Sequence, residues 1–420
     1  MMGSKLIALI VIVLGVIAIA QLVRVYELTA KLRNRGEHEI STRDNNLNGK
    51  MMFVFMIAMY AFFIWLMLRF GWTGRGEAAS TIGKETDWLL NLNFIIIILV
   101  FFLTNTLLFF FSYKYVKKEG VKALYFPHNN KLEMIWTIVP ACVLAVIIIL
   151  GLKKWNDATS DAKKESIRIE LFSKQFDWTA RYAGQDNQLG RFDYKLTTDN
   201  NELALLTTAT IDSAILSMEN GPNGIKTLEA KLNDRKIMMV PEDREKMELD
   251  FSRKQRMIRL LYQMKERHDA KIDKAAWDDI IQKDTLYLCV NKEYEFNFRA
   301  KDVIHSAFFP HFRAQINTVP GMVTRTKFTP DITTKSMRDR MNNPKFNYVL
   351  MCNKICGGAH YKMKMIVVVL EEKDYKKWIA SKKSFKDNYF AAAAAAPAPA
   401  SATDADSTMV TKDTASVAMN

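Results

Sequence analysis

Four apolar runs near the start of the chain restrict its fold more than any other sequence feature. They cover residues 6–23, 51–68, 94–112 and 135–152. Each is about as long as a helix that crosses the hydrocarbon core of a bilayer, and membrane helices tolerate a proline such as Pro140. The first run follows Lys5 and could instead belong to a cleaved signal peptide. Its length, and the lack of a small-x-small cleavage site after it, favour a retained helix.

The basic residues between these runs predict their orientation. Residues 24–50 hold six Lys or Arg and residues 113–131 hold five, whereas residues 70–90 hold two. Excess positive charge marks the cytoplasmic side of a membrane. We therefore expect the N-terminus and everything after residue 153 to lie outside the cytoplasm. Much of the formal net charge of +14 lies in these loops, where it indicates the orientation of the helices in the membrane. We therefore expect no nucleic-acid partner.

Beyond residue 155 the sequence pattern changes to that of short strands. Residues 166–172 and 293–300 alternate apolar and polar side chains, as half-buried strands do, and residues 303–308, 346–352 and 364–370 are also strand-like. Residues 195–285 interrupt this pattern, because residues 242–283 are densely charged with apolar residues at helical spacing. We expect this insertion to present a solvated face or a subunit contact rather than a ligand site. From about residue 381 the Ala/Pro-rich composition predicts a disordered tail.

Sulfur and imidazole side chains gather between residues 352 and 363. Cys352, Cys356, His360 and Met363 fall within this segment, and His305 lies upstream in a strand-like run. Thiolate and thioether sulfurs combined with imidazoles favour copper, and a mononuclear blue-copper site needs only one cysteine. A second cysteine four residues on would let both sulfurs bridge two copper ions. The alternative is a disulfide between the two cysteines in an oxidising compartment.

This order of residues, His…Cys-x-x-x-Cys-x-x-x-His-x-x-Met, resembles the binuclear copper (CuA) motif of cytochrome c oxidase subunit II. The resemblance implies five side-chain ligands: His305, Cys352, Cys356, His360 and Met363. It also implies that Lys354 binds copper through its backbone carbonyl. The family has Glu at that position, whose side chain also reaches a magnesium ion. Lysine cannot bind magnesium, so that site is not carried over to this chain.

Two further stretches extend the resemblance. Residues 133–140, EMIWTIVP, are similar to the family's E-T-I-W-T-I-L-P opening of its second membrane helix. This places Glu133 at the entrance of a proton pathway into subunit I, although a favourable position at the positive end of the helix dipole is the alternative. Residues 175–182 resemble the aromatic stretch Q-W-Y-W-x-x-x-Y that lies over the copper site. Phe176 stands where the family has its electron-entry Trp and Trp178 matches the second Trp, whereas aromatics in strands usually pack in the core.

These features predict four parts of the chain. Residues 1–90 form an N-terminal extension with two transmembrane helices, 91–154 a transmembrane hairpin, 155–380 a copper domain and 381–420 the tail. The expected fold is an α-helical membrane anchor of two to four transmembrane helices joined to an all-β, cupredoxin-like Greek-key sandwich with a helical insertion.

The resemblance implies subunit II of a respiratory haem–copper oxidase in a bacterial inner membrane, with its copper domain in the periplasm. Such a subunit accepts electrons from cytochrome c and passes them to haem in subunit I, where oxygen is reduced and protons are pumped. The sequence contains no C-x-x-C-H motif, so no haem is expected in this chain. The lysines at 354, 362 and 364 disfavour a strongly basic donor, because like charges repel across an interface.

Three other functions compete with this interpretation. A quinol oxidase subunit II would lack the two cysteines, and nitrous oxide reductase would need a large propeller domain. A membrane-anchored copper carrier or oxidase assembly factor is the alternative from a different class, since it would expose its cysteines for metal exchange.

Overall fold

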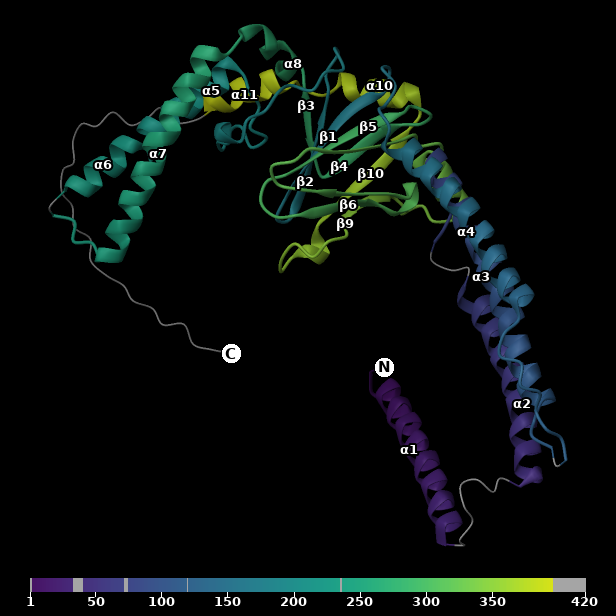
Figure 1. The fold of residues 1–420 in the computed structure, drawn as a ribbon. Coiled ribbons are helices and arrows are strands. Elements are labelled where there is room, and N and C mark those ends of the chain that lie inside the picture. Colours follow the sequence, from purple (N-terminus) through teal and green to yellow (C-terminus); the bar gives the residue numbers. More distant parts are fainter. Residues whose placement is uncertain (1, 33–40, 72–74, 119, 235, 396–420) are drawn as a thin grey trace. The chain divides into compact units, whose positions relative to one another are not determined.

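The computed structural model describes residues 2–32, 41–71, 75–118, 120–234 and 236–395. The chain divides into two compact units. The first contains Met1–Gly76 and Asp87–Leu152, and the second contains Glu77–Thr86 and Lys153–Asn420. The first unit consists of helices and the second is built around β-strands (Figure 1).

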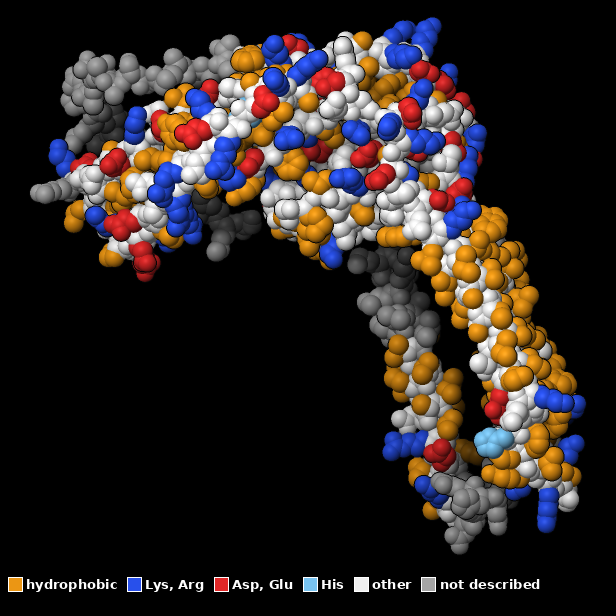
Figure 2. Space-filling view, turned by 45° about the horizontal axis from the view of Figure 1, so that its top comes forward, with side chains coloured by type: hydrophobic (Ala, Val, Ile, Leu, Met, Phe, Trp, Pro, Cys, Tyr) orange, Lys and Arg blue, Asp and Glu red, His pale blue; other side chains and the backbone are white. Residues whose placement is uncertain are grey.

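Long helices make up the first unit. They are α1 (Met2–Leu32), α2 (Thr42–Leu66, extended by the π-helical turn Met67–Gly71), α3 (Thr81–Lys114) and α4 (Asn130–Thr159). Within the described residues, α2 with its extension, α3 and α4 are long and apolar enough to cross a membrane, with mean hydropathies of 2.4, 2.7 and 2.7. Hydrophobic side chains cover the outside of these helices, whereas charged side chains are interspersed over the second unit (Figure 2). This is a membrane anchor of the expected kind.

Helix α2 packs lengthwise and antiparallel against α3. The Tyr60 hydroxyl donates a hydrogen bond to the Phe102 carbonyl at 3.0 Å, and the two rings lie 4.6 Å apart. Near the other end of α2, a side chain at Gly49 would lie 2.7 Å from Val116, so the missing Cβ permits close approach. Small residues at helix contacts are typical of membrane helices. The added helix α2 is therefore part of one packed anchor with α3.

The second unit is a sandwich of two five-stranded sheets, as the sequence predicted. One sheet has the order β3-β2-β1-β5-β8 and the other β4-β10-β9-β6-β7. The strands are β1 (Ile167–Lys174), β2 (Asp177–Tyr182), β3 (Ile280–Lys283), β4 (Thr285–Cys289), β5 (Tyr294–Ala300), β6 (His305–Phe309), β7 (Ala314–Thr318), β8 (Thr324–Phe328), β9 (Tyr348–Cys352) and β10 (Lys364–Leu370). Short helical segments join them: η4 (Pro310–Phe312), α9 (Thr334–Arg340) and η5 (His360–Lys362).

The sheets are mixed rather than antiparallel throughout. Strand β1 pairs with β5, and β4 with β10, in parallel, and the other named pairs are antiparallel. Both parallel pairs join strands that are far apart in the sequence. Local alternation of side chains reveals a strand but not its distant partner, so the sequence did not indicate these two parallel pairs.

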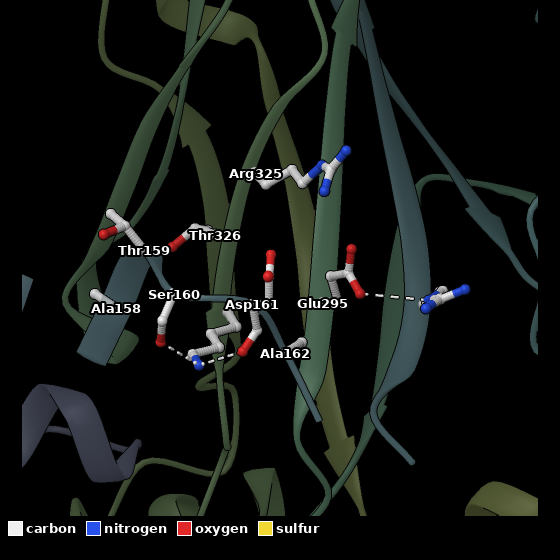
Figure 3. A pocket seen from close by; sticks show the side chains of 10 residues that line it. Ala158, Thr159, Ser160, Asp161, Ala162, Glu295, Arg325 and Thr326 are labelled. Atoms are coloured by element: carbon white, nitrogen blue, oxygen red, sulfur yellow. Dashed lines mark hydrogen bonds and ion pairs between the residues drawn. The ribbon is translucent and has the colours of Figure 1, made fainter. Parts of the chain in front are cut away.

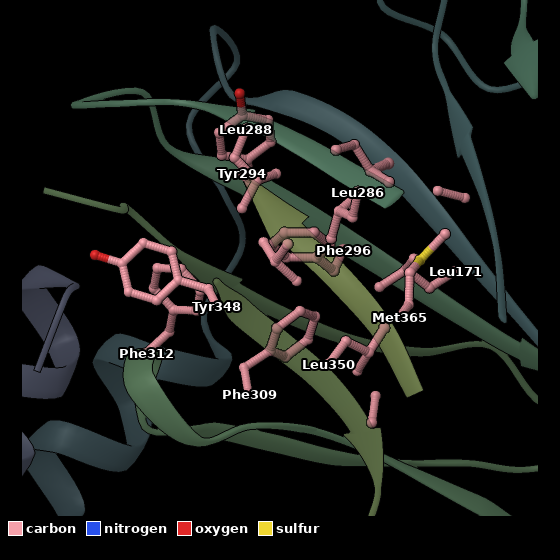
Figure 4. Packing of buried hydrophobic residues seen from close by; sticks show 14 of the residues in the cluster. Leu171, Leu286, Leu288, Tyr294, Phe296, Phe309, Phe312, Tyr348, Leu350 and Met365 are labelled. Atoms are coloured by element: carbon pink, nitrogen blue, oxygen red, sulfur yellow. The ribbon is translucent and has the colours of Figure 1, made fainter. Parts of the chain in front are cut away.

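Aromatic side chains fill the space between the sheets. The ring of Phe328 lies 4.7 Å from Phe296, 4.9 Å from Phe312 and 5.3 Å from Phe309. All four side chains are buried, and Figure 4 shows Phe296, Phe309 and Phe312 within the cluster. Each aromatic residue removes a large apolar area from water. The core therefore holds together the two sheets that carry the site at one end of the sandwich.

The segment that precedes α3 is part of the sandwich unit. The backbone N–H of Ala79 donates to the His311 carbonyl at 2.8 Å, and the Ser80 hydroxyl donates to the Phe312 carbonyl at 2.8 Å. Lys84 forms an ion pair with Asp331 at 2.7 Å. These contacts fix the first turn of α3 to the loops of the second sheet.

The end of α4 is attached to the first sheet, which contains β8. Lys327 on β8 donates to the Ser160 hydroxyl and to the Asp161 carbonyl, both at 2.9 Å. Beside them Arg168 pairs with Glu295 at 3.3 Å across a shallow hollow (Figure 3). The two hydrogen bonds of Lys327 therefore anchor the end of α4 to β8.

The predicted insertion grows out of one edge of the first sheet. The chain leaves at Tyr182 and returns at Ile280, and these two residues are paired in the register of β2 and β3. Between them lie η2 (Tyr194–Leu196), α5 (Thr208–Asn220), α6 (Ile225–Asn233), α7 (Pro241–Arg267), η3 (Ala270–Ile272) and α8 (Asp273–Trp277). The predicted end at residue 285 was therefore late, because β3 already belongs to the sheet.

A buried charge network lies where the insertion covers the first sheet. Arg181 donates to Glu170 at 2.5 Å and to Asp279 at 2.7 Å, and Arg299 donates to Glu170 at 2.6 Å and to the Leu203 carbonyl at 2.9 Å. Burial opposes ionisation of Glu170, yet the two guanidinium groups lower its pKa to about 2. Removing one partner of such a buried network leaves an uncompensated charge. The sandwich thus depends on the insertion to complete this network.

The predicted disordered tail begins too early at residue 381. Helix α10 (Glu372–Ala380) is followed by α11 (Phe385–Ala395). Phe385 and Tyr389 are buried against Phe172 and Leu205, and the ring of Phe385 stacks on Trp277 at 5.5 Å. The alanine run obscured these aromatic residues in the sequence. The prediction of a disordered tail over residues 396–420 lies outside the described residues.

We expect Phe385→Ala to destabilise the second unit by about 3 kcal/mol or more, since a buried Phe leaves a cavity. Phe390→Ala is the matched control, because Phe390 is 48% exposed on the same helix. Thermal unfolding of the full chain in detergent, followed by tryptophan fluorescence, measures both. Equal midpoints for the two variants would show that α11 does not pack as described.

Candidate metal centre

Strand pairing brings the two halves of the predicted site together. Strand β6 begins with His305, and β9 ends with Cys352. The two strands pair through Ala307 opposite Cys352 and Phe308 opposite Met351. The backbone N–H of Cys352 also donates to the Met363 carbonyl at 3.0 Å, which closes the segment between them into a loop. Sequence-distant ligands are thereby fixed at one end of the sandwich.

The five predicted side-chain ligands converge on one another. The Sγ atoms of Cys352 and Cys356 lie 3.8 Å apart. His305 Nδ1 lies 3.9 Å from the Cys352 sulfur, and His360 Nδ1 lies 3.5 Å from the Cys356 sulfur. The Met363 sulfur lies 3.8 Å from that of Cys356. Each thiol thus has its own imidazole, and the two sulfurs form the centre of the group.

The two cysteines are free thiols in an apolar setting. Their sulfur–sulfur distance of 3.8 Å is well beyond the ~2.05 Å of a disulfide. Burial, followed by the hydrogen bond and the charge of Cys352, raises the pKa of Cys356 to about 11. A bound cation would stabilise both thiolates against that cost, because metal ligation requires deprotonated sulfur. Two thiols, two imidazoles and a thioether fit copper by their softness.

Lys354 contributes its backbone to the group. The Lys354 carbonyl oxygen lies 3.2 Å from the Cys352 sulfur, whereas the lysine side chain is exposed. A carbonyl at this distance from a sulfur can complete the ligand set of a metal bound there. The ammonium group cannot, so this position offers no side-chain ligand for magnesium.

Two residues around the ligands were not assigned a role from the sequence. Asp302 accepts a hydrogen bond from His305 Nε2 at 2.8 Å, so His305 presents Nδ1 to the sulfurs. Burial opposes ionisation of Asp302, but hydrogen bonds from the Gln175 backbone, His305 and the Val303 backbone lower its pKa. The Gln175 side chain donates to the Cys356 carbonyl. A carboxylate three residues before a candidate ligand histidine was the available signal for Asp302.

Phe176 and Trp178 both lie beside the group. Trp178 is fully buried, with its ring centroid 6.3 Å from that of His305. Phe176 is half-buried and packs against the ligand loop, since a Cβ at Gly357 would lie 2.9 Å from its ring. Gly357 also has φ of +140°, which disfavours any other residue. Packing against the core accounts for both aromatic positions, and an electron-entry role for them stays a prediction.

Glu133 belongs to the helical unit and has a structural partner. It lies in the first turn of α4, in the helical unit. Its carboxylate accepts from the Asn129 backbone N–H at 3.2 Å, while the Asn129 side chain accepts from the Leu132 N–H at 3.1 Å. This reciprocal pattern is a helix cap. The predicted proton role is additional to this cap and stays a prediction.

Comparison with known proteins points to one family. Residues 72–153 match the model of the cytochrome c oxidase subunit II transmembrane domain. An alternative cytochrome c oxidase subunit 2 from Bradyrhizobium diazoefficiens is 23% identical over 299 residues, which cover 71% of this chain and 80% of the relative. Cytochrome c oxidase subunit 2 from Cereibacter sphaeroides is 21% identical over 311 residues, with coverages of 74% and 80%.

Solved structures include the periplasmic domain of subunit II of cytochrome oxidase from Bradyrhizobium japonicum. It is 15% identical, with a TM-score of 0.25, and the match covers 53% of this chain and 96% of that one.

We expect Asp302→Asn to lower copper affinity about 10- to 100-fold, because the amide is a weaker acceptor for the imidazole N–H. Asp177→Asn is the control, since Asp177 is a nearby carboxylate bonded to the Trp178 N–H. Competition titration against a copper chelator measures both. The assigned role of Asp302 is contradicted if the two variants lose affinity equally.

Proposed function

We propose that this chain, which is similar to cytochrome c oxidase subunit II, is the electron-accepting subunit of a haem–copper oxidase. His305, Cys352, Cys356, His360 and Met363 would hold two copper ions, which would supply one-electron transfer from a cytochrome c towards haem in subunit I. There oxygen is reduced and protons are pumped.

The convergence of two free thiols with two imidazoles and a thioether carries this proposal. The sulfur–sulfur distance of 3.8 Å leaves both thiolates available to the same pair of ions. Bridging by both sulfurs would let two copper ions share one electron, so that little rearranges when it arrives or leaves. His305 and His360 would each bind one ion, with Met363 and the Lys354 carbonyl as the outer ligands.

The surrounding residues would keep this centre in place during turnover. The carboxylate of Asp302 orients His305, and Gln175 holds the Cys356 carbonyl, so the ligands are arranged before the metal binds. Core packing around the fully buried His305 would exclude water from one side of the centre. A rigid, water-poor setting keeps the reorganisation that accompanies electron transfer small.

The proposed topology assigns each part to a compartment. The basic loops 24–50 and 113–131 would face the cytoplasm, and the copper domain would lie in the periplasm of a bacterial inner membrane. Glu133 would then lie at the cytoplasmic start of α4, where a carboxylate can collect protons for subunit I. Trp178, beside His305, would lie near the path of incoming electrons.

A copper carrier or assembly factor is the competing function. Such a protein needs thiols that a partner can reach. Cys352 is 8% exposed and Cys356 5%. Burial of both sulfurs favours a resident centre over metal exchange.

Purification of the native complex tests the proposal. We expect two copper ions per chain at this site, a mixed-valence signal from the shared electron, and haem in the same complex. Cys356→Ser is expected to remove the mixed-valence signal, because one bridging sulfur is lost. One copper per chain, or a complex without haem, would contradict the function proposed.

Lys354 and Met363 are expected to respond differently to substitution. Lys354→Ala keeps the backbone carbonyl and should leave the copper absorption spectrum nearly unchanged. Met363→Leu removes a thioether and should shift the reduction potential while most of the metal stays bound. Redox titration of both variants measures this. Loss of copper in the first, or no shift in the second, would show that the assigned ligand roles are wrong.

A further inference from the structure

The loops around the sulfur group form one continuous surface. The Gln175 backbone N–H donates to Asp302 at 2.7 Å, and the Gln175 side chain donates to the Cys356 carbonyl. The Asn353 backbone N–H donates to the Ser306 carbonyl at 3.1 Å. These bonds join residues 301–304 to the ligand loop 353–363. We call the exposed part of these two segments the tip surface.

Apolar side chains are unusually exposed on the tip surface. Ile355 is 87% exposed and Tyr361 76%, and both belong to the ligand loop. Val303 and Ile304 are 38% and 42% exposed beside His305. His360, which precedes Tyr361, is the only one of the five predicted side-chain ligands that is half-exposed rather than buried. The apolar part of the tip surface therefore borders the most accessible ligand.

The charged side chains of the tip surface are mostly basic. Lys301, Lys354 and Lys362 are exposed, and residues 353–364 contain three lysines and no acidic residue. The one carboxylate in these segments, Asp302, accepts hydrogen bonds from His305 and from the Gln175 and Val303 backbones. The nearby Lys174 pairs with Glu202 and adds little free charge. An apolar centre with charged surroundings is the general plan of a docking surface.

We propose that the tip surface docks an electron-carrying protein whose own docking face is acidic. This inference rests on the proposed function, because it names the partner of the same copper centre. A basic face would meet Lys301, Lys354 and Lys362 at close range, and like charges across an interface disfavour association. An acidic face is instead attracted before contact, which raises the association rate about 10- to 1,000-fold at low salt. The exposed side chains of Ile355 and Tyr361 then make apolar contacts with the partner, and such contacts do not depend on hydrogen-bond geometry.

The test uses the purified oxidase complex and one cytochrome c in two charge states. The native form is a basic cytochrome c, and the second is the same protein with its lysines succinylated. Stopped-flow absorbance at the copper and haem bands gives the second-order rate of electron entry. We expect the succinylated form to react at least about tenfold faster at low ionic strength. This advantage should shrink towards 0.15 M salt, where the screening length is about 8 Å.

Charge-reversal variants locate the effect on the surface. Lys301→Glu combined with Lys362→Glu should abolish or invert the preference. The matched control combines Lys335→Glu with Lys373→Glu, two exposed lysines on α9 and α10 that lie outside the tip surface. The control changes net charge equally and should keep the preference. The copper spectrum is recorded for each variant to show that the centre is intact.

The outcomes separate this inference from the proposed function. Faster reaction of the native basic cytochrome, equal rates for the two forms, or an equal effect of the control variant would each overturn the acidic partner. Copper that is reduced before haem in those same traces would leave the proposed function standing. A complex in which haem is reduced without the copper would overturn the proposed function as well.

Discussion

The pairing of β6 with β9 is the constraint on which the metal centre depends. It places His305 beside Cys352, although 47 positions separate them in the chain. That pairing lies in the sheet that contributes Phe309 to the core, where its ring packs against those of Phe296, Phe312 and Phe328. A one-residue slip would turn every side chain of a strand to the opposite face. Aromatic packing therefore determines which atoms meet at the end of the sandwich, and the ligand loop only completes what the strands begin.

The two neighbouring thiols of the site resist ionisation. Burial and mutual proximity disfavour the thiolate, as the raised pKa of Cys356 indicates. Asp302 orients the ring of His305 through a hydrogen bond, and its carboxylate supplies no positive charge that would stabilise a thiolate. Nothing within the described part of the site offers a cation to the sulfurs, since Lys354 turns its side chain outward. The arrangement is thus complementary to a cation that is supplied from outside.

Sequence reasoning predicted the membrane helices, the strands and the convergence of five ligand residues, because each leaves a local signal. Apolar length indicates a span, period two a strand, and sulfur spacing a site. The parallel partners β1–β5 and β4–β10 left no such signal, since pairing between distant strands is a tertiary property. Asp302 and Gln175 were missed as supports because their roles depend on loops that meet only in the fold. Helix α11 was missed because composition averaged Phe385 and Tyr389 with the alanines that follow.

The insertion and the strands beneath it depend on each other. Its ends meet as the pair Tyr182 and Ile280, so the sheet accepts a long excursion there as readily as a tight turn, and the closure entropy grows only slowly with length. The insertion also affects the strands that it covers, because it keeps water away from Phe172, Glu170 and Arg181. Excising the insertion would expose one apolar side chain and a charge cluster adapted to a dry setting. Removing the insertion would therefore require the strands beneath it to change as well.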